Sequence, residues 1–208
     1  EPYKSSQPGW AEQDPEVYWQ ALTEACLKLK AENPAYFENL TGVGVTTMRD
    51  SLVNVDEQGK PLRPLMVWLD QRKAAPVYKP GIIMKLIIWF IGMTDSIQKA
   101  QRDGKCNWIR QNQPEIWKKT HKFLQVSGLL NIRLTGTFRD SVASQIGHVP
   151  FDYKRQKWGN PKRFLVFSAK LYPIEKDKLP ELVKPGETIG QITEWASEMT
   201  GLPVGLPV

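Results

Sequence analysis

Two short clusters of polar residues follow apolar runs of the sequence and could bind a ligand. The first is TTMRD at Thr46–Asp50, and the second is WLDQR at Trp68–Arg72. Each cluster places a carboxylate beside an arginine, and this pairing of an acceptor with a forked donor is what vicinal hydroxyls require. In open α/β sheets, ligand-binding residues gather where strands end. Spacing alone nevertheless favours ordinary salt bridges at strand ends, since such pairs are common.

Other catalytic or metal-binding patterns are missing from the sequence. It contains no GxxxxGK[ST] phosphate loop, no HExxH and no paired CxxC, and two cysteines are too few for a disulfide framework. His121 lies in a Lys-rich segment that we expect to be a solvated helix face. His148 lies in a loop before Pro150, and we expect it to make a local structural hydrogen bond. Neither histidine has an obvious partner, so metal and triad chemistry are unsupported.

The elements that would carry these clusters follow from capping and periodicity. Asp14 can accept a hydrogen bond at the start of a helix, Pro15 suits its first position, and apolar residues then recur at helical spacing to about Lys30. Asp56–Gly59 is a predicted turn between two strands. The pattern indicates an α/β layer with a partly antiparallel sheet. Strands are predicted at Val43–Thr47, Leu52–Val55 and Leu65–Leu69, and further helices at Ile82–Gln101, Pro114–Val126 and Leu129–Leu134.

Composition and hydropathy limit the class of protein. The chain has 208 residues, of which 41% are hydrophobic and 24% charged, and this excludes collagen, coiled coil and wholesale disorder. Glu1 opens no secretory signal, so we expect a cytoplasmic protein. The most apolar run, Gly81–Met93, contains Lys85 and is shorter than the roughly 20 residues of a membrane span. We therefore expect a buried helix with Trp89 and Phe90 in the core, and no membrane partner.

The net charge of +6 is concentrated in the second half of the chain. Residues 105–208 carry 16 Lys and Arg against 9 Asp and Glu. A basic surface can bind nucleic acid, yet no nucleic-acid motif accompanies the charge, so solubility is the preferred explanation and no nucleic-acid partner is expected. The basic residues concerned are Lys118, Lys119, Lys122, Lys154, Arg155, Lys157, Lys162 and Arg163.

Seven sequence blocks together resemble one family, the FGGY carbohydrate kinases. They occur in the family's order and cover nearly the whole chain, which makes the resemblance specific. The blocks are PGWAEQDP at Pro8–Pro15, GVGVTTMRD at Gly42–Asp50, GKPLRPLMVWLDQR at Gly59–Arg72, KCNWIRQNQPEIW at Lys105–Trp117, LLNIRLTG at Leu129–Gly136, DSVAS at Asp140–Ser144 and VKPGETIGQIT at Val183–Thr193.

The resemblance implies a fold and an activity. The fold would be a ribonuclease-H-like α/β domain of the actin, hexokinase and Hsp70 ATPase type, with a mixed sheet flanked by helices and incomplete at both ends. Residues 1–208 would form most of the N-terminal, sugar-binding domain, with 73–136 as a mainly helical insertion or lid region. The full-length protein would transfer the γ-phosphoryl group of ATP to a hydroxyl of a sugar or polyol, of the pentulose or polyol class. ATP and Mg²⁺ would be its cofactors, a C-terminal kinase domain its partner, and a homodimer one possible assembly.

The resemblance also suggests substrate-binding residues. Arg49 and Asp50 match a loop that contacts sugar directly, and Met48 belongs to the same loop. Glycerol kinases have Arg–Glu at this pair and xylulose kinases His–Gly, so the sequence lies nearer the former. Ala100, however, stands where glycerol kinases place a tyrosine, which argues against a simple glycerol kinase. The family's WxDxR strand end, matched by Asp70, Gln71 and Arg72, is expected to support the same pocket, where a carboxylate could orient Arg49 or a hydroxyl.

The family's phosphate machinery is not found in the sequence. An Asp-x-Gly-Thr turn would precede Glu1, and the catalytic aspartate of a Gly-x-Gly-Asp turn would follow Val208. We therefore expect no catalytic residue within these 208 residues, few or no contacts to ATP and Mg²⁺, and no turnover by this segment alone. The alternative hypothesis is a non-catalytic sugar-binding or sensing domain derived from the same fold.

Overall fold

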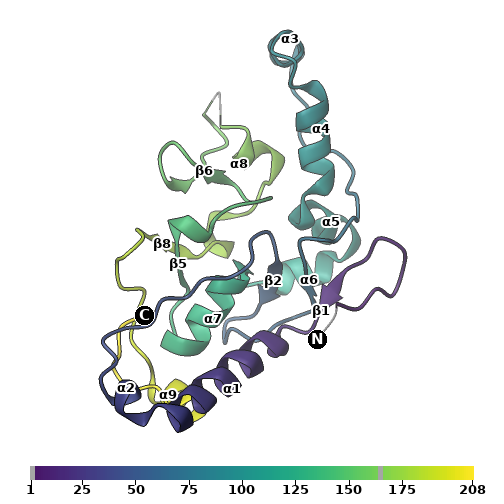
Figure 1. Ribbon diagram of the computed structural model, residues 1–208. Helices are drawn as coiled ribbons and strands as arrows, with labels where there is room; N and C mark the ends of the chain where they lie inside the picture. Colours follow the sequence, from purple (N-terminus) through teal and green to yellow (C-terminus); the bar gives the residue numbers. More distant parts are fainter. Residues whose placement is uncertain (1–2, 164–165) are drawn as a thin grey trace.

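A four-stranded antiparallel sheet, in the order β1-β3-β2-β4, forms the centre of the fold. The computed structural model describes residues 3–163 and 166–208 (Figure 1). β2 and β4 pair over all four of their residues. The bounds are β1 Glu12–Gln13, β2 Leu52–Val55, β3 Leu65–Met66 and β4 Lys122–Gln125. The predicted antiparallel pairing is confirmed, as is the predicted strand at Leu52–Val55.

Both faces of this sheet are covered. Val53 and Val55 pack into one cluster of buried residues, whereas Leu52 packs into another. The neighbouring residues of β4 divide in the same way, with Leu124 on the first face and Phe123 on the second. Because successive side chains of a strand point to opposite faces, a sheet between two layers needs apolar residues at nearly every position.

Three helices, α1, α7 and α9, cover the first face and contact one another. α1 begins as predicted, because the backbone N–H of Glu16 donates to Asp14 Oδ1 at 3.0 Å. α7 ends as predicted at Gly136, whose φ of +70° closes the helix in the left-handed conformation. The bounds are α1 Glu16–Glu32, α7 Val126–Thr135 and α9 Glu194–Thr200, with the short α2 at Pro34–Glu38 after α1.

The second face packs against the helices between β3 and β4 and against residues beyond β5. Met66, Ile109, Trp117 and Phe123 are all buried in this layer. The helices are α3 Ile82–Phe90, α4 Thr94–Asp103, α5 Lys105–Asn112, α6 Pro114–Lys119 and α8 Ser168–Leu171. Two small sheets complete the described chain, a parallel pair β5 Arg139–Ser141 with β8 Glu181–Val183 and an antiparallel pair β6 Phe151–Asp152 with β7 Lys157–Trp158. Two 3₁₀ turns lie at Val142–Ser144 and Lys176–Lys178.

The strand predicted at Val43–Thr47 is not found. Val43 N donates to Pro207 O at 2.9 Å, but residues 43–47 belong to no sheet of the described chain. Val43 and Val45 are only partly buried, against the first-face cluster. A β-branched run needs a neighbouring strand to pair with, and here none of the described residues supplies one. The strand predicted at Leu65–Leu69 is also shorter, since β3 ends at Met66.

The helix predicted at Ile82–Gln101 is two helices, and the first is not buried. Gly92, with φ of +68°, separates α3 from α4. α3 lies at the far end of an arm that also contains α4 and α5 (Figure 1). Only one side of α3 packs, through Met84 and Ile88. The prediction of a buried helix was wrong for the other side, where the exposed residues are Ile82, Ile83, Leu86, Trp89 and Phe90.

The helix predicted at Pro114–Val126 ends early, at Lys119. Thr120 closes α6 by donating from Oγ1 to Ile116 O at 2.7 Å. The chain then forms β4, whose four residues pair with β2. Sheet pairing and burial on both faces therefore outweigh the helical continuity that the sequence suggested. His121 lies between α6 and β4 rather than on a helix, with its ring 5.0 Å from that of Phe138, which corrects the solvated-helix prediction.

No helix in residues 3–163 or 166–208 is long and apolar enough to cross a membrane.

Neighbouring residues of α3 should differ sharply in their contribution to stability. Ile88 is 4% exposed, so Ile88→Ala should lower the free energy of unfolding by about 2–5 kcal/mol. Trp89 is 73% exposed, so Trp89→Ala should change it by less than about 0.5 kcal/mol. Urea denaturation of the two variants measures the difference. A comparable loss in both would mean that the exposed side of α3 is covered in the folded protein.

Candidate functional site

Asp50 joins three segments that are distant in the sequence. Lys105 Nζ, at the start of α5, lies 2.8 Å from Asp50 Oδ2. His148 contacts the same carboxylate twice, through Nδ1 at 2.8 Å from Oδ2 and through its backbone N–H, which donates to Oδ1 at 2.9 Å. Although burial raises the pKa of Asp50, the hydrogen bonds from His148 and the charge of Lys105 outweigh it and hold the pKa below its ordinary value of 3.8. Asp50 is therefore an ionised carboxylate.

The loop that carries His148 is built to approach Asp50 closely. Gly147 has φ of +118°, and a Cβ at this position would lie 2.5 Å from Asp50 Oδ1. Asp50 itself has φ of +57°, an uncommon conformation for a residue other than glycine. Only glycine therefore fits beside the carboxylate, and its neighbour His148 is brought into contact with Asp50.

A buried polar network fixes the start of this loop. Asp140 accepts hydrogen bonds from Ser127 Oγ at 2.8 Å and from Gln145 Nε2 at 2.7 Å. Burial raises the pKa of Asp140 above its ordinary value, and these hydrogen bonds, which act in the opposite direction, offset only part of that rise. Gln125 Nε2 also donates to Ile146 O at 3.1 Å, which ties the loop to the end of β4. The position of His148 is thus set from the central sheet.

The other residues of the first cluster face the surface. Arg49 is exposed, and its side chain makes no hydrogen bond or ion pair with any residue that the structure describes. Met48 is 42% exposed and receives a hydrogen bond from Tyr18 Oη at 3.5 Å from Sδ. Trp68, which is 59% exposed, lies on the neighbouring segment, where its backbone N–H donates to Ser51 Oγ at 3.2 Å. The loop thus has an unpartnered cationic donor, and the segment that carries the exposed Trp68 is bonded to it at Ser51.

Asp70 and Arg72 of the second cluster form a buried salt bridge with each other. Arg72 Nε lies 2.9 Å from Asp70 Oδ1, and Arg72 Nη2 lies 2.6 Å from Asp70 Oδ2. The guanidinium carbon of Arg72 lies 4.1 Å from the ring centre of Trp10 and 4.4 Å from that of Trp108. Asp70 Oδ2 also accepts from Ala11 N at 2.8 Å. The strand-end salt bridge that spacing favoured is therefore what the structure shows here.

This second cluster supports the N-terminal segment. Arg72 Nη2 contacts Glu12 Oε1 at 2.9 Å, and Glu12 also pairs with Arg63. Burial lowers the pKa of Arg63 to about 10, against the raising effect of Glu12. Gln71 is exposed, and its backbone N–H donates to Gly9 O at 2.8 Å. No hydrogen bond or ion pair joins Asp70 to Arg49 in the described residues, so the expected orientation of Arg49 by that carboxylate is not observed.

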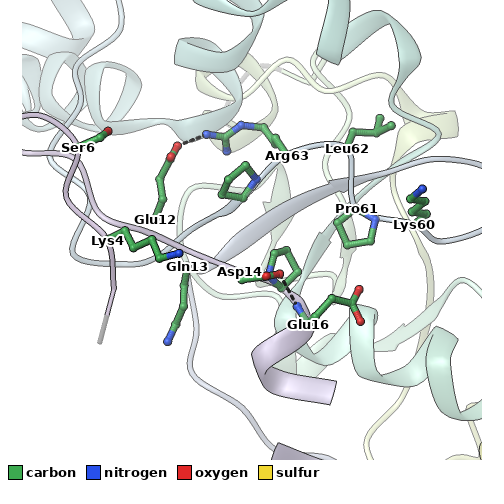
Figure 2. Close-up of a pocket in the computed structure, with 12 residues that line it drawn as sticks. Lys4, Ser6, Glu12, Gln13, Asp14, Glu16, Lys60, Pro61, Leu62 and Arg63 are labelled. Carbon is green, nitrogen blue, oxygen red and sulfur yellow. Dashed lines mark hydrogen bonds and ion pairs between the residues drawn. The ribbon is translucent and has the colours of Figure 1, made fainter. Parts of the chain in front are cut away.

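A pocket of about 540 Å³ lies between the N-terminal segment and residues 60–64. Figure 2 shows Glu12 and Arg63 paired at one side of it, and the backbone N–H of Glu16 donating to Asp14 at another. The lining does not include Met48, Arg49, Asp50, Asp70, Gln71 or Arg72. This pocket is therefore separate from the residues that the sequence suggested.

Lys105 and His148 are the members of the cluster that sequence reasoning missed. Asp50 is 55 residues from Lys105 and 98 residues from His148 along the chain. The expectation of a local hydrogen bond for His148 was therefore wrong. The one available signal in the sequence was Gly147 before His148. A glycine permits another residue to approach closely, but it does not indicate which residue that is. Within residues 3–163 and 166–208, no group of three or more His, Cys, Asp or Glu side chains could hold a metal ion.

Comparison with known proteins identifies relatives over the whole chain. A family model described as "FGGY family of carbohydrate kinases, N-terminal domain" matches residues 1–208. L-fuculokinase of Escherichia coli K12 is 28% identical over 210 residues, covering 96% of this chain and 40% of that protein. Xylulose kinase of Staphylococcus xylosus is 24% identical over 213 residues, covering 99% of this chain and 41% of that protein. The chain thus spans about two fifths of the length of these curated relatives.

Solved structures share the fold. The crystal structure of xylulose kinase from Rhodospirillum rubrum superposes with a TM-score of 0.75 and 23% identity, covering 99% of this chain and 42% of that one. The crystal structure of Plasmodium falciparum glycerol kinase with ADP gives a TM-score of 0.70 and 22% identity, covering 99% of this chain and 41% of that one. The ribonuclease-H-like, actin- and hexokinase-type fold expected from the sequence is therefore confirmed.

The buried pair of Arg72 should matter far more to stability than an exposed pair of the same type. Arg72→Met would leave Asp70, whose side chain is 1% exposed, without its counter-ion, and should lower the free energy of unfolding by about 3–5 kcal/mol. The matched control is Arg139→Met, because Arg139 and Glu181 are 41% and 63% exposed; it should cost less than about 1 kcal/mol. Chemical denaturation compares them, and equal losses would contradict the assigned role.

The Asp50 cluster should make stability depend on acid pH. Because folding lowers the pKa of Asp50, its contribution is present above the ordinary pKa of 3.8 and is lost as the pH falls through the lower, folded-state value. Asp50→Asn should therefore reduce the free energy of unfolding at pH 7, and the difference from wild type should shrink below about pH 3.8. Urea denaturation at pH 7 and pH 3 measures both values. A difference that stays constant would show that the charge of Asp50 is not what stabilises the cluster.

Proposed function

The chain belongs to the FGGY family of carbohydrate kinases, and from that premise we propose that it forms the sugar-binding part of an ATP-dependent kinase. The full-length kinase would transfer the γ-phosphoryl group of ATP to a hydroxyl of a sugar or polyol, of the pentulose or polyol class. The relatives' names support this, because they are kinases of fuculose, xylulose and glycerol. The proposal places the substrate at Met48, Arg49 and Asp50.

The observation that carries the proposed site is the contrast between Asp50 and Arg49. Asp50 is fixed by Lys105 and His148, whereas its neighbour Arg49 is exposed and lacks a partner among the described residues. A donor that is unpaired beside a fixed polar cluster is available to a ligand. Small-molecule sites commonly combine a few fixed polar groups with apolar surface. The apolar surface here would come from Met48 and Trp68, which are exposed on adjoining segments.

Asp70 and Arg72 have a supporting role in this proposal. Both side chains are buried, and Arg72 is held by Asp70, by Glu12 and between the rings of Trp10 and Trp108. In this proposal they therefore fix the position of the segment Trp68–Arg72 and do not contact the substrate. Gln71 is exposed and is the residue of this group that could reach a ligand.

The phosphate chemistry is not assigned to residues of this chain. The described residues form no cluster that fits a metal ion, and the sequence lacks a GxxxxGK[ST] loop. ATP and Mg²⁺ belong to the proposed activity of the whole kinase, in which a C-terminal domain would supply their contacts. We therefore derive no step of phosphoryl transfer from the residues described.

Binding can be tested on this chain directly. A thermal-shift screen against pentuloses, polyols and sugar acids should find one sugar class that raises the melting temperature, because a ligand that binds the folded state stabilises it. A full-length kinase that carries this domain should then phosphorylate the same sugar with ATP. Sugar binding without kinase activity in the full-length protein would instead support a sugar-sensing domain, and polyanion binding alone would contradict both.

Arg49→Ala in a full-length kinase should raise the Michaelis constant for the sugar. The increase should be about tenfold to a hundredfold, since a hydrogen bond from a charged donor contributes about 1.5–3 kcal/mol. The Michaelis constant for ATP should change little, because Arg49 is assigned to the sugar. Arg163→Ala, at an exposed arginine before α8, is the control and should leave both constants unchanged. Steady-state kinetics in both substrates decides, and an unchanged sugar dependence would remove Arg49 from the site.

A further inference from the structure

The imidazole ring of His148 is held on one edge and open on the other. Nδ1 lies 2.8 Å from Asp50 Oδ2, and the ring of Tyr172 packs against it edge-to-face at 5.6 Å between centres. The side chain of His148 is nevertheless 27% exposed. No residue of the described chain hydrogen-bonds to Nε2, the nitrogen on the side of the ring away from Asp50. One ring nitrogen is therefore committed to the protein, and the other is available.

The partner of Nδ1 decides which nitrogen carries the proton. The carboxylate of Asp50 is ionised, because Lys105 and His148 lower its pKa, so its oxygens can only accept hydrogen bonds. Nδ1 must then be the donor in the 2.8 Å contact. In a neutral imidazole the other nitrogen is an acceptor, and a carboxylate on one nitrogen commonly fixes this tautomer. In the neutral ring, Nε2 therefore carries a lone pair that can accept a hydrogen bond.

The groups around His148 are short of acceptors. Arg49 and Lys105 can only donate hydrogen bonds. Asp50 already accepts three, one from Lys105 Nζ and two from His148. Each hydroxyl of a sugar both donates and accepts, so a site made of cations alone would leave the hydroxyl protons unpaired, at a cost in affinity. Nε2 of His148 is the one acceptor in this cluster with no competing partner among the described residues.

We propose that His148 is a substrate-binding residue whose Nε2 accepts a hydrogen bond from a substrate hydroxyl, with Asp50 as the positioning residue that fixes the ring. The substrate group that this assignment requires is a hydroxyl, which has a proton to donate. This assignment rests on the proposed sugar-kinase function. It adds to the proposed site a hydrogen-bond acceptor, Nε2 of His148, that Arg49 and Asp50 do not supply.

Two substitutions separate the two ends of the ring. His148→Asn can place an amide N–H near the position of Nδ1 and keep the bond to Asp50, but it removes the acceptor at Nε2. His148→Gln is longer and can return an amide oxygen to the Nε2 position. In a full-length kinase, Asn should raise the Michaelis constant for the sugar by about tenfold, while Gln should stay within about threefold of wild type. The Michaelis constant for ATP should not change in either variant.

The opposite ranking would overturn the proposal. If Asn behaves like wild type and Gln raises the Michaelis constant for the sugar, His148 only supports Asp50. If both variants match wild type, the ring does not contact the substrate. A wild-type kinase that phosphorylates no sugar would contradict the proposed function itself, which keeps the two failures distinct.

The tautomer can be measured on this chain without any activity. Long-range ¹⁵N–¹H spectra of the histidine rings at pH 7.5 should show His148 protonated at Nδ1 and bare at Nε2. Asp50→Asn should remove this preference, because an amide can donate as well as accept. Addition of the sugar found by thermal shift should move the Nε2 resonance of His148 and leave that of His121 in place. A ring protonated at both nitrogens, or an Nε2 resonance that does not respond to sugar, would overturn the assignment.

Discussion

The carboxylate of Asp50 is the interaction on which the candidate site depends. It lies where the TTMRD loop, the start of α5 and the loop before β6 meet, and it binds Lys105 and His148 together. A carboxylate that is largely removed from water is costly unless it is paired and hydrogen-bonded. Here the pairing also dictates the backbone, because the contact requires a positive φ at Asp50 and a residue without a side chain at Gly147. The conformation of three segments therefore follows from one charge.

Behind this contact, buried polar groups of the surrounding elements hold the segments that meet there. The Asp140 network fixes the loop that precedes His148, and the salt bridge between Asp70 and Arg72 fixes the segment after β3. Both lie among side chains that are almost completely buried. Groups that reach the surface are thus supported by groups that do not. Such support is what keeps a binding site in one geometry before the ligand arrives.

Capping residues in the sequence predicted where helices begin and end, whereas the sequence predicted distant contacts poorly. Asp14 and Gly136 mark the ends of helices through contacts within a few residues, so these ends were predictable. The strand β2 was predictable because its mostly apolar residues suit a strand that is buried on both faces. The exposed side of α3 was not, because its apolar composition is the same whether or not another layer covers it. The contact of His148 with Asp50 spans 98 residues and leaves no periodic pattern. The family resemblance named the Arg49 loop but could not name the residues that hold it.

The two Asp–Arg pairs look equivalent in sequence, and their different surroundings give them different capacities. At Asp70 and Arg72, the guanidinium is covered by two tryptophan rings, and its Nε and Nη2 bind two carboxylates, whereas Nη1 is buried without a hydrogen-bond partner among the described residues. At positions 49 and 50, the aspartate turns inward to Lys105 and His148, and the arginine is left without a partner in the described chain. A ligand gains nothing from a donor that must first break a buried salt bridge, whereas an exposed one costs little to engage. Burial, rather than residue type, therefore separates the pair that stabilises the domain from the pair at which we propose that sugar binds.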